Sequence, residues 1–381
     1  MYNFNAFLIF PVLVFLSFPS QILATLPDII PNKYIVTLKQ HIPTSHVDQH
    51  HAWVTEIHSR SLDADILAGI ERRYNISGFQ GYAGSFDDAT IQRIRDSHDV
   101  AAVESDQLGL GALSHRAGSG SQDYIFDSSA GRGTFAYVVD TGVREDHQDF
   151  GGRASSQWAV GNNHTDGAGH GTHVAGIIGG REYGVAKGAT IIAVKVIFNQ
   201  NTTYSDTLAG YTWAVQDIAS RKRNSRSVIN MSLGGGYSAA QNNAIQGAFE
   251  AGILTVVAAG NNASDAVETS PASAPNAVTV GATTITKQFA GYSNFGAMVD
   301  ILAPGSDIMS ASPHSTDAYA VRTGTSMASP HVAGLLLYLM GQKNYTSPGA
   351  VVSHLKELAI QDVLTGVPKG TANLMAYNGA A

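Results

Sequence analysis

Residues 135–142 read Phe-Ala-Tyr-Val-Val-Asp-Thr-Gly, a strongly apolar run that ends on Asp140 and a glycine turn. Short apolar runs bounded by turn residues are typical of strands that are buried on both faces of a sheet. Four later runs have the same character, at residues 191–196, 228–233, 254–258 and 278–280. Between these runs we expect helices, most clearly at residues 207–222, where apolar side chains recur at helical spacing.

The alternation of strands and helices predicts an α/β fold, with a mostly parallel sheet covered by helices on both faces. Active sites in such folds gather at the carboxyl ends of the strands. Asp140 lies just past one such end, and Ser232 and Asn261 lie at or beyond two others. We therefore expect a catalytic domain over residues 108–381 whose chemistry lies along this edge of the sheet.

A smaller unit precedes this domain, at residues 25–107. It contains strand candidates at 33–38, 81–86 and 100–103 and helix candidates at 50–57 and 88–96. Their order fits the β-α-β-β-α-β pattern of a ferredoxin-like α+β domain.

Composition limits what the chain can do and where it acts. The 381 residues carry a formal net charge of −7, which argues against a general affinity for nucleic acid. The chain has no cysteine, so it has neither disulfides nor a thiol nucleophile. An apolar run at residues 6–18 is too short to span a bilayer comfortably and precedes a small residue, Ala24, so residues 1–24 are expected to be a signal peptide. We expect a secreted, extracellular monomer without a membrane anchor.

Two further motifs supply a base and a nucleophile. His170 stands in Gly-His-Gly-Thr-His-Val-Ala-Gly, and Ser326 stands in Gly-Thr-Ser-Met-Ala-Ser-Pro ahead of an apolar helical run. A serine hydroxyl becomes a nucleophile only when a neighbouring base takes its proton, and an imidazole titrates in the right range for that work. With Asp140 to orient the imidazole, the chain order Asp, His, Ser is one of those known for serine hydrolases.

The surroundings of Ser326 favour an oxyanion. A helix N-terminus offers free N–H groups, and the amide of Asn261, in Ala-Ala-Gly-Asn, is a second candidate donor to the developing negative charge. Pro330 cannot donate to the carbonyl of Ser326, so the first turn of this helix is expected to be altered.

These motifs together resemble the subtilisin-like serine proteases, and within them the proteinase K group, over nearly the whole chain. The resemblance implies a serine endopeptidase that acts on polypeptides through an acyl-enzyme. It also implies that the first unit is an inhibitory propeptide, so that the enzyme is made as a zymogen and has its own propeptide as an intramolecular partner.

The resemblance extends to the residues that bind substrate. It implies that an extended peptide substrate lies beside a strand that contains Ser232, Leu233 and Gly234. It also implies that Tyr204 belongs to a second segment that flanks the substrate. One wall of the primary pocket is implied at Ala258, Ala259 and Gly260. Small wall residues and no evident charge predict broad specificity with an apolar preference at P1. It also implies a structural calcium ion, held by the carbonyls of Pro275 and Ala277 and by Asp300; oxygen ligands suit this ion. No organic cofactor is expected.

The junction between the two units departs from the family pattern. Glu104–Gln107 resembles the end of a propeptide, whereas Leu108–His115 resembles a point already inside the mature enzyme. The stretch that normally holds the self-cleavage point is missing between them. Either the chain uses a shorter linker or the sequence lacks a piece.

Three other functions fit the sequence less well. An α/β-hydrolase esterase needs Gly-x-Ser-x-Gly and a different chain order. A zinc site at His170 and His173 lacks the rest of a zinc motif, and we interpret His173 and His331 as structural. A self-inhibited pseudoprotease, whose propeptide never leaves, remains open because of the short junction. Glycosylation sequons occur at six positions, of which the one at Asn230 is expected to be buried: Asn75, Asn163, Asn201, Asn230, Asn262 and Asn344.

Overall fold

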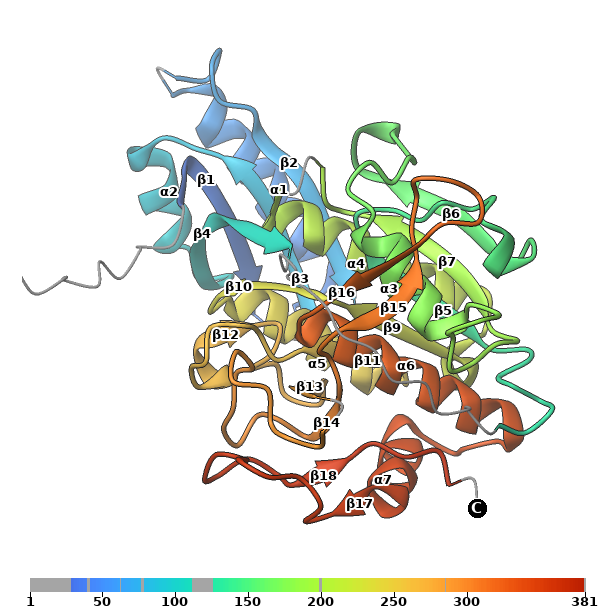
Figure 1. The fold of residues 1–381 in the computed structure, drawn as a ribbon. Helices are drawn as coiled ribbons and strands as arrows, with labels where there is room; N and C mark the ends of the chain where they lie inside the picture. The colour runs from blue at the N-terminus through green and yellow to red at the C-terminus, as the bar shows by residue number, and fades with distance from the viewer. Residues whose placement is uncertain are drawn as a thin grey trace, which may run out of the picture.

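The computed structural model describes residues 29–39, 42–61, 63–76, 79–111, 126–198, 201–284 and 286–379 (Figure 1). The signal-peptide candidate at 1–24 and part of the predicted junction, residues 112–125, lie outside the described residues.

The first part of the chain, residues 29–111, forms the expected α+β unit, which we call the N-terminal unit. Its elements are β1 (Ile29–Leu38), α1 (Thr44–Ser59), β2 (Gly69–Ile76), β3 (Phe79–Ser85), α2 (Asp88–Arg95) and β4 (Val100–Gly111). The strands pair antiparallel in the spatial order β4-β1-β3-β2. Strand β2, which the sequence pattern alone does not single out, completes the β-α-β-β-α-β order. Under the sheet, α1 and α2 bury a core that includes Val54, Ile57, Ile91 and Ile94.

Strand β4 does not stop at residue 107, where the sequence analysis ends the first unit. It continues to Gly111 and enters the second domain between two short strands, β8 (Asn201–Thr203) and β10 (Leu233–Gly236). Both neighbours are antiparallel to it: Leu108 lies opposite Thr203, and Gly111 lies opposite Leu233. Figure 1 shows the end of β4 reaching the edge of the larger domain beside β10. The sheet of the N-terminal unit is thus continuous with these strands.

The second domain is built on a large sheet, as expected. Within the described residues its nine strands lie in the order β17-β18-β14-β13-β11-β9-β5-β7-β6, and all neighbours are parallel except β17 and β18. Their bounds in that order are Ile360–Gln361, Leu374–Met375, Ile301–Pro304, Val278–Thr283, Leu254–Ala258, Ser227–Met231, Phe135–Asp140, Thr190–Lys195 and Ala154–Ala159. A hairpin of β15 (Ile308–Ala311) and β16 (Tyr319–Arg322) lies apart from this sheet, and β12 (Thr269–Ser270) pairs with β10.

Helices cover both faces of the sheet. One core joins the sheet to α3 (His170–Gly179), α6 (Thr325–Gln342) and α7 (Pro348–Leu358). The other joins it to α4 (Tyr204–Ser220) and α5 (Ala239–Glu250), and includes Tyr74 and Ala83 of the N-terminal unit. The N-terminal unit therefore packs on the α4 and α5 side of the molecule. Among the described helices, none is both long and apolar enough to cross a bilayer.

The bounds predicted for one strand are wrong. Residues 228–233 do not form a single strand: β9 ends at Met231, and β10 begins at Leu233. The break falls on Ser232, whose side chain and carbonyl are both used in contacts with Ser326. The chain then leaves the parallel sheet and presents Leu233 and Gly234 to β4 instead.

Candidate active site

Asp140 and His170 are brought together at the carboxyl end of β5. Both are buried, with Asp140 fully so. The Nδ1 atom of His170 lies 2.8 Å from Oδ1 and 2.9 Å from Oδ2 of Asp140. An ionised carboxylate only accepts hydrogen bonds, so Nδ1 carries the proton that is shared with Asp140. The tautomer with a proton on Nδ1 leaves the other ring nitrogen, Nε2, as an acceptor.

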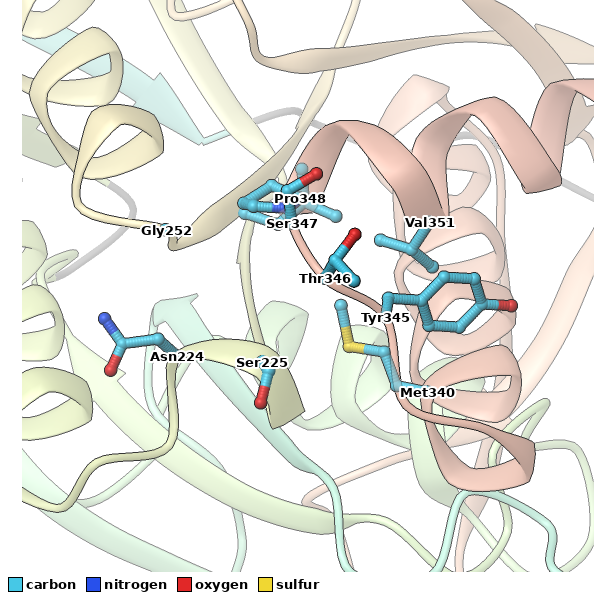
Figure 2. Close-up of a pocket in the computed structure, with 10 residues that line it drawn as sticks. Asn224, Ser225, Gly252, Met340, Tyr345, Thr346, Ser347, Pro348 and Val351 are labelled. Carbon is cyan, nitrogen blue, oxygen red and sulfur yellow. The ribbon is translucent and has the colours of Figure 1, made fainter.

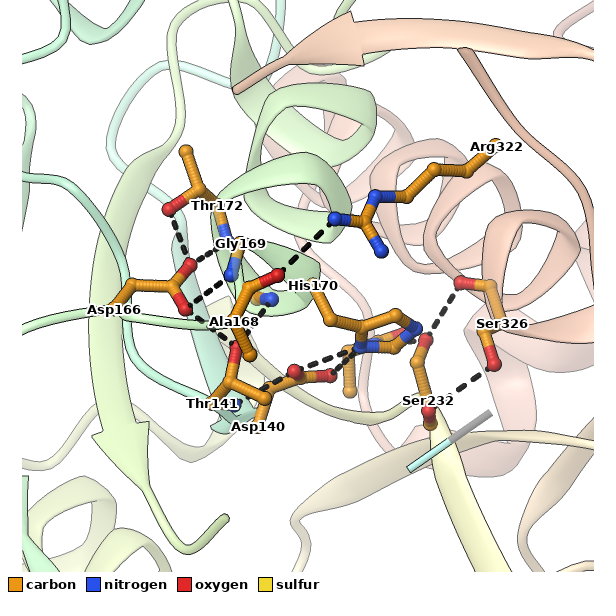
Figure 3. A network of polar contacts seen from close by, with 12 residues as sticks. Asp140, Thr141, Asp166, Ala168, Gly169, His170, Thr172, Ser232, Arg322 and Ser326 are labelled. Carbon is orange, nitrogen blue, oxygen red and sulfur yellow. Dashed lines mark hydrogen bonds and ion pairs between the residues drawn. The ribbon is translucent and has the colours of Figure 1, made fainter. Parts of the chain in front are cut away.

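The turn before α3 aims this imidazole. Gly169, the N-cap of α3, has a φ of 75°, a left-handed conformation that favours glycine. A side chain there would also collide with Pro313, since an added Cβ would lie 2.7 Å from that ring. Nε2 of His170 is buried and has no hydrogen-bond partner among the described residues. In Figure 3 the imidazole lies between the Asp140 carboxylate and the pair formed by Ser232 and Ser326.

Ser326 is the second residue of α6 and is fully buried. Its hydroxyl donates to the carbonyl of Ser232 at 3.2 Å. In return, the hydroxyl of Ser232 donates to the carbonyl of Ser326 at 2.8 Å. Pro330 explains the second bond, because proline at that position cannot supply the N–H that a helix would offer to this carbonyl. The altered first turn is therefore satisfied by the side chain at the β9–β10 break.

Asn261 and Ser326 border one small space. The carboxamide oxygen of Asn261 accepts from the N–H and the hydroxyl of Thr325, at 2.8 and 2.9 Å, which orients its amide. Gly324 has a φ of 152°, and a Cβ added there would lie 3.5 Å from Nδ2 of Asn261 and 3.7 Å from the backbone nitrogen of Ser326. That nitrogen is in the first turn of α6, where a helix provides no acceptor. Two donors thus converge on a space that the glycine leaves open.

Asp166 organises the loop that carries both His170 and the turn after Asp140. Its Oδ1 accepts from the hydroxyl of Thr141 at 2.8 Å and from the N–H of Gly169 at 2.7 Å. Its Oδ2 accepts from the N–H and the hydroxyl of Thr172, at 2.9 and 2.5 Å. Asp166 was not predicted from the sequence. Its signal was an aspartate four residues before the histidine in a glycine-rich loop, a place where a side chain often bonds the backbone.

Two cations balance the buried carboxylates of Asp140 and Asp166. Lys195, at the end of β7, is buried and donates to the carbonyl of Thr141. Arg322 donates to the carbonyl of Ala168 at 3.1 Å (Figure 3). Burial lowers the pKa of both cations, and the two carboxylates oppose that shift. The site is therefore a largely buried charged cluster, in which electrostatic interactions are stronger than at the surface.

Strand β4 lies as an extended segment between β8 and β10, with backbone pairing on both sides. We call the place that it occupies between these two sides the groove. Leu233 and Gly234, which were expected beside a bound peptide, lie opposite Gly111 and Leu110 of β4. The second side is residues 201–203, whereas Tyr204 begins α4 directly after them. Its buried hydroxyl donates to the carbonyl of Gly236 at 2.6 Å, so Tyr204 braces β10 from behind.

The residues expected to form a pocket wall lie at the carboxyl end of β11, of which Ala258 is the last residue. Ala258 and Ala259 are buried, and the N–H of Gly260 donates to Thr325 at 3.1 Å. Gly260 also has no room for a side chain, because an added Cβ would lie 2.4 Å from Nδ2 of Asn294. This segment is thereby tied to the residue that precedes Ser326.

Of the residues expected to hold calcium, Asp300 contacts a different cation, Lys356. Asp300 bonds to the chain just after Ala277, since its Oδ2 accepts from the N–H of Thr279 at 2.9 Å. Its Oδ1, however, accepts from Nζ of Lys356 at 2.8 Å. With one carboxylate neutralised by one ammonium, the donor set does not fit a divalent ion as it stands. Among the described residues, no group of three or more His, Cys, Asp or Glu side chains is gathered to hold a metal.

The other histidines have structural contacts. Nε2 of His173 bonds to the carbonyls of Ile308 and Ala320, and burial lowers its pKa to about 3. Nδ1 of His331 bonds to the carbonyl of Met327 at 2.8 Å. Neither arrangement suits a zinc ligand. Asn230 is fully buried in β9, as expected, whereas the other five sequon asparagines are exposed.

A pocket elsewhere in the molecule is unrelated to this cluster. It has a volume of about 140 Å³ and lies between the end of α6, the start of α7 and the turn at residues 224–225 (Figure 2). Met340, Tyr345 and Val351 form its apolar side. It shares no residue with the Asp140, His170 and Ser326 set.

Comparison with known proteins agrees with this geometry. Residues 131–375 match the model of the subtilase family, and residues 33–108 match that of the peptidase inhibitor I9. Alkaline protease 1 of Aspergillus flavus is 52% identical over 373 residues, covering 92% of each chain. Alkaline proteinase of Hapsidospora chrysogena is 45% identical, covering 92% of this chain and 93% of the relative. The crystal structure of a cold adapted subtilisin-like serine proteinase superposes with a TM-score of 0.64 at 40% identity, over 72% of this chain and 98% of that one.

A family model that spans most of the second domain, and relatives that span both units, place the chain without ambiguity. The I9 match coincides with the N-terminal unit and identifies it as a propeptide. The chain belongs to the subtilase family: it is a subtilisin-like serine endopeptidase made as a zymogen with its own I9 propeptide.

Proposed function

We propose that Asp140, His170 and Ser326 are the catalytic triad of this endopeptidase. The observation that carries the proposal is the imidazole of His170, which is held by Asp140 at Nδ1 and is unpaired at Nε2. A buried acceptor without a hydrogen-bond partner lowers the stability of the folded state, so the unpaired Nε2 of His170 calls for an explanation, and a role in catalysis supplies one. In free enzymes the bond between nucleophile and base is often poorly formed and tightens only with substrate.

In the proposed reaction, the hydroxyl of Ser326 turns from the carbonyl of Ser232 to Nε2 of His170. The imidazole takes its proton as the oxygen attacks the peptide carbonyl, and Asp140 stabilises the imidazolium that forms. Nδ2 of Asn261 and the N–H of Ser326 donate to the oxyanion. His170 then gives its proton to the leaving amine, and water releases the acyl group from Ser326 by the reverse steps.

We propose broad specificity with an apolar preference at P1. The substrate backbone adds as an extended strand between β8 and β10, as β4 does, so main-chain bonds supply much of the affinity. The wall at Ala258, Ala259 and Gly260 is small and uncharged. Profiling on a peptide library checks this: strict selection for lysine or arginine at P1 contradicts it.

We also propose that the propeptide reaches beyond residue 107. Leu108–Gly111 lie between β8 and β10, with Leu110 opposite Gly234 and Gly111 opposite Leu233. Counted along the sequence, the pair that follows Gly111 and Leu233 is Ala112 and Ser232, and Ser232 is the partner of Ser326, so we expect self-cleavage after Ala112. On this proposal the short junction needs no missing piece.

Secretion by the signal peptide at residues 1–24 and glycosylation at exposed sequons complete the proposal. The five exposed asparagines are open to modification, whereas Asn230 is not. Asn201 is a special case because it lies opposite Leu110 in the groove. Mass spectrometry of secreted protein before and after deglycosylation identifies the modified positions.

One experiment tests catalysis and maturation together. Secreted protein is sequenced from its N-terminus and labelled with a serine-directed phosphonate, alongside the Ser326→Ala variant. We expect a mature chain that begins at Leu113 and a label on Ser326, and an unprocessed, unlabelled variant. A wild-type chain that keeps its precursor mass and takes no label supports the self-inhibited pseudoprotease instead. Cleavage elsewhere with a label on Ser326 refutes only the register argument.

A further inference from the structure

Lys356 and Asp300 form an ion pair at the position where a metal ion was expected. Nζ of Lys356 lies 2.8 Å from Oδ1 of Asp300, and the exposed fractions of the two side chains are 38% and 28%. The other carboxylate oxygen, Oδ2, accepts from Thr279 N. Both oxygens of this carboxylate are therefore engaged by groups of the protein.

The fold of the C-terminal region positions Lys356 beside Asp300. Lys356 lies in the last turn of α7, the end at which a helix favours a cation. Val351 and Leu355 are fully buried in the core beneath α7, which fixes the rotation of the helix. Asp300 directly precedes β14, and its backbone N–H donates to the carbonyl of Thr279 in β13 at 2.9 Å. The pair thus links α7 to the β13–β14 edge of the sheet.

Calcium and this ammonium group compete for the same oxygen. Calcium sites take six to eight oxygen ligands, and their affinity depends on how many of these are charged. Here one carboxylate is the charged ligand, and Lys356 cancels its charge. A divalent ion bound to Oδ1 would lie against the ammonium, so binding requires that the lysine first leave.

We propose that Lys356 is the resident cation of this site, and that it takes the structural place of the calcium ion expected at Pro275, Ala277 and Asp300. The stability contributed by this region is then independent of free calcium. Removing the lysine frees the Asp300 carboxylate oxygen that it occupies, and so should allow calcium to bind at this position.

The test uses full-length chain with the Ser326→Ala change, which prevents self-digestion. Lys356→Met keeps most of the aliphatic stem and removes the charge. Lys369→Met is the matched control, because Lys369 is an exposed lysine of the same C-terminal region. Asp300→Asn is made alone and combined with Lys356→Met, so that calcium binding at Asp300 can be distinguished from calcium binding elsewhere in the chain. Thermal midpoints are measured in chelator and in about 5 mM calcium chloride, several times the Kd of the weakest protein sites. Calcium binding is followed by titration calorimetry.

In the parent chain and in Lys369→Met, we expect that Asp300→Asn does not change how the thermal midpoint responds to calcium. Lys356→Met should lose about 1–3 °C in chelator, regain it in calcium and bind calcium at least tenfold more tightly than the parent. Adding Asp300→Asn should abolish that gain. A parent chain that loses stability in chelator only when Asp300 is present overturns the proposal. A Lys356→Met chain that responds to calcium no more than the control overturns it as well.

Discussion

Asp166 accepts the hydroxyl of Thr141 at 2.8 Å and so joins the loop that precedes His170 to the turn that follows Asp140. Through its other three hydrogen bonds it fixes Gly169 and Thr172 on either side of the histidine. Asp166 touches no reacting atom in the proposed mechanism. It is therefore a positioning residue.

Asp166→Asn should lower kcat about 10- to 100-fold and leave KM nearly unchanged, because small displacements of a catalytic group cost rate rather than binding. An amide can accept at one position only, so two of the four bonds are lost or strained. Steady-state kinetics on a peptide substrate measure the split. Asp146→Asn is the control, because that side chain is 67% exposed and pairs with Arg144 at the surface. Equal losses in both variants, or a pure KM effect, contradict the positioning role.

Removal of the proposed oxyanion donor gives a second prediction. Asn261→Ala should reduce kcat about 10²- to 10³-fold, a range established for the corresponding asparagine of a subtilisin. KM should change little, since the donor acts on charge that develops only in the transition state. Asn262→Ala, at the exposed neighbouring position, should retain near-normal kcat. If the two variants match in kcat, Asn261 has no such role.

The contact between Ser232 and Ser326 makes a third prediction, this time about stability. Ser232→Ala leaves the buried carbonyl of Ser326 without its donor, because Pro330 cannot replace it. An unsatisfied buried polar group costs about 1–3 kcal/mol, so the free energy of unfolding should fall by that amount. Urea unfolding of the inhibited enzyme measures it, with Ser315→Ala as the exposed control. An unchanged urea midpoint shows that another group satisfies the carbonyl.

Release of the propeptide should depend on its contact with α4. Arg72 forms an ion pair with Asp206 and donates to Ser205 at 3.0 Å, and Tyr74 donates to the carbonyl of Ser205 at 3.0 Å. Arg72→Ala should therefore shorten the lag before precursor becomes active, by about two- to tenfold for roughly 0.5–1.4 kcal/mol of lost contact. Arg73→Ala, whose side chain is exposed, is the control. Precursor activation is followed by hydrolysis of a peptide substrate. An equal lag in both variants argues against the contact.

The propeptide should also lose stability in acid. His51 is buried in the N-terminal unit, and neither ring nitrogen has a hydrogen-bond partner among the described residues. Burial, the charge of Arg73 and the neighbouring His50 lower its pKa to about 4, while Asp48 opposes the shift. An unfolded histidine has a pKa near 6.5 and gains its proton earlier. The unit's stability is therefore complete above about pH 6.5 and declines as the pH falls toward 4.

Thermal unfolding of inactive precursor between pH 4 and 7 checks this sign. His51→Leu should flatten the decline, whereas His46→Leu, an exposed change on the same helix, should not. A propeptide transition that is equally stable at pH 4.5 and pH 7 refutes the role of His51.

The sequence predicted the sheet well because its central strands are buried on both faces. The run at 254–258 matches β11 residue for residue, and Asp140 falls at the end of β5. Peripheral strands such as β6 were not predicted, because they are partly exposed and carry polar residues. The strand at 228–233 failed at Ser232 for another reason: the break is dictated by the contact with α6, nearly a hundred residues away.

The candidate site divides in the same way. Asp140, His170, Ser326 and Asn261 stand in motifs whose neighbours are specific, so they could be proposed as site residues from the sequence alone. Asp166 and Lys195 act through long-range contacts to Thr141 and could not be. Lys356 could not be predicted at all, because no local sequence pattern indicates that a lysine in a helix will pair with an aspartate 56 positions earlier.

The backbone pairing of β4 on both sides has a consequence for which substrates are cut. If substrates bind as proposed, the two strand edges that β4 leaves accept a backbone only where that backbone has no hydrogen-bond partners of its own. A segment within a folded helix or sheet must first open locally, and the rate of attack then follows the free energy of that opening. Among proteins that offer an apolar P1 residue, loosely folded chains would thus be cut first.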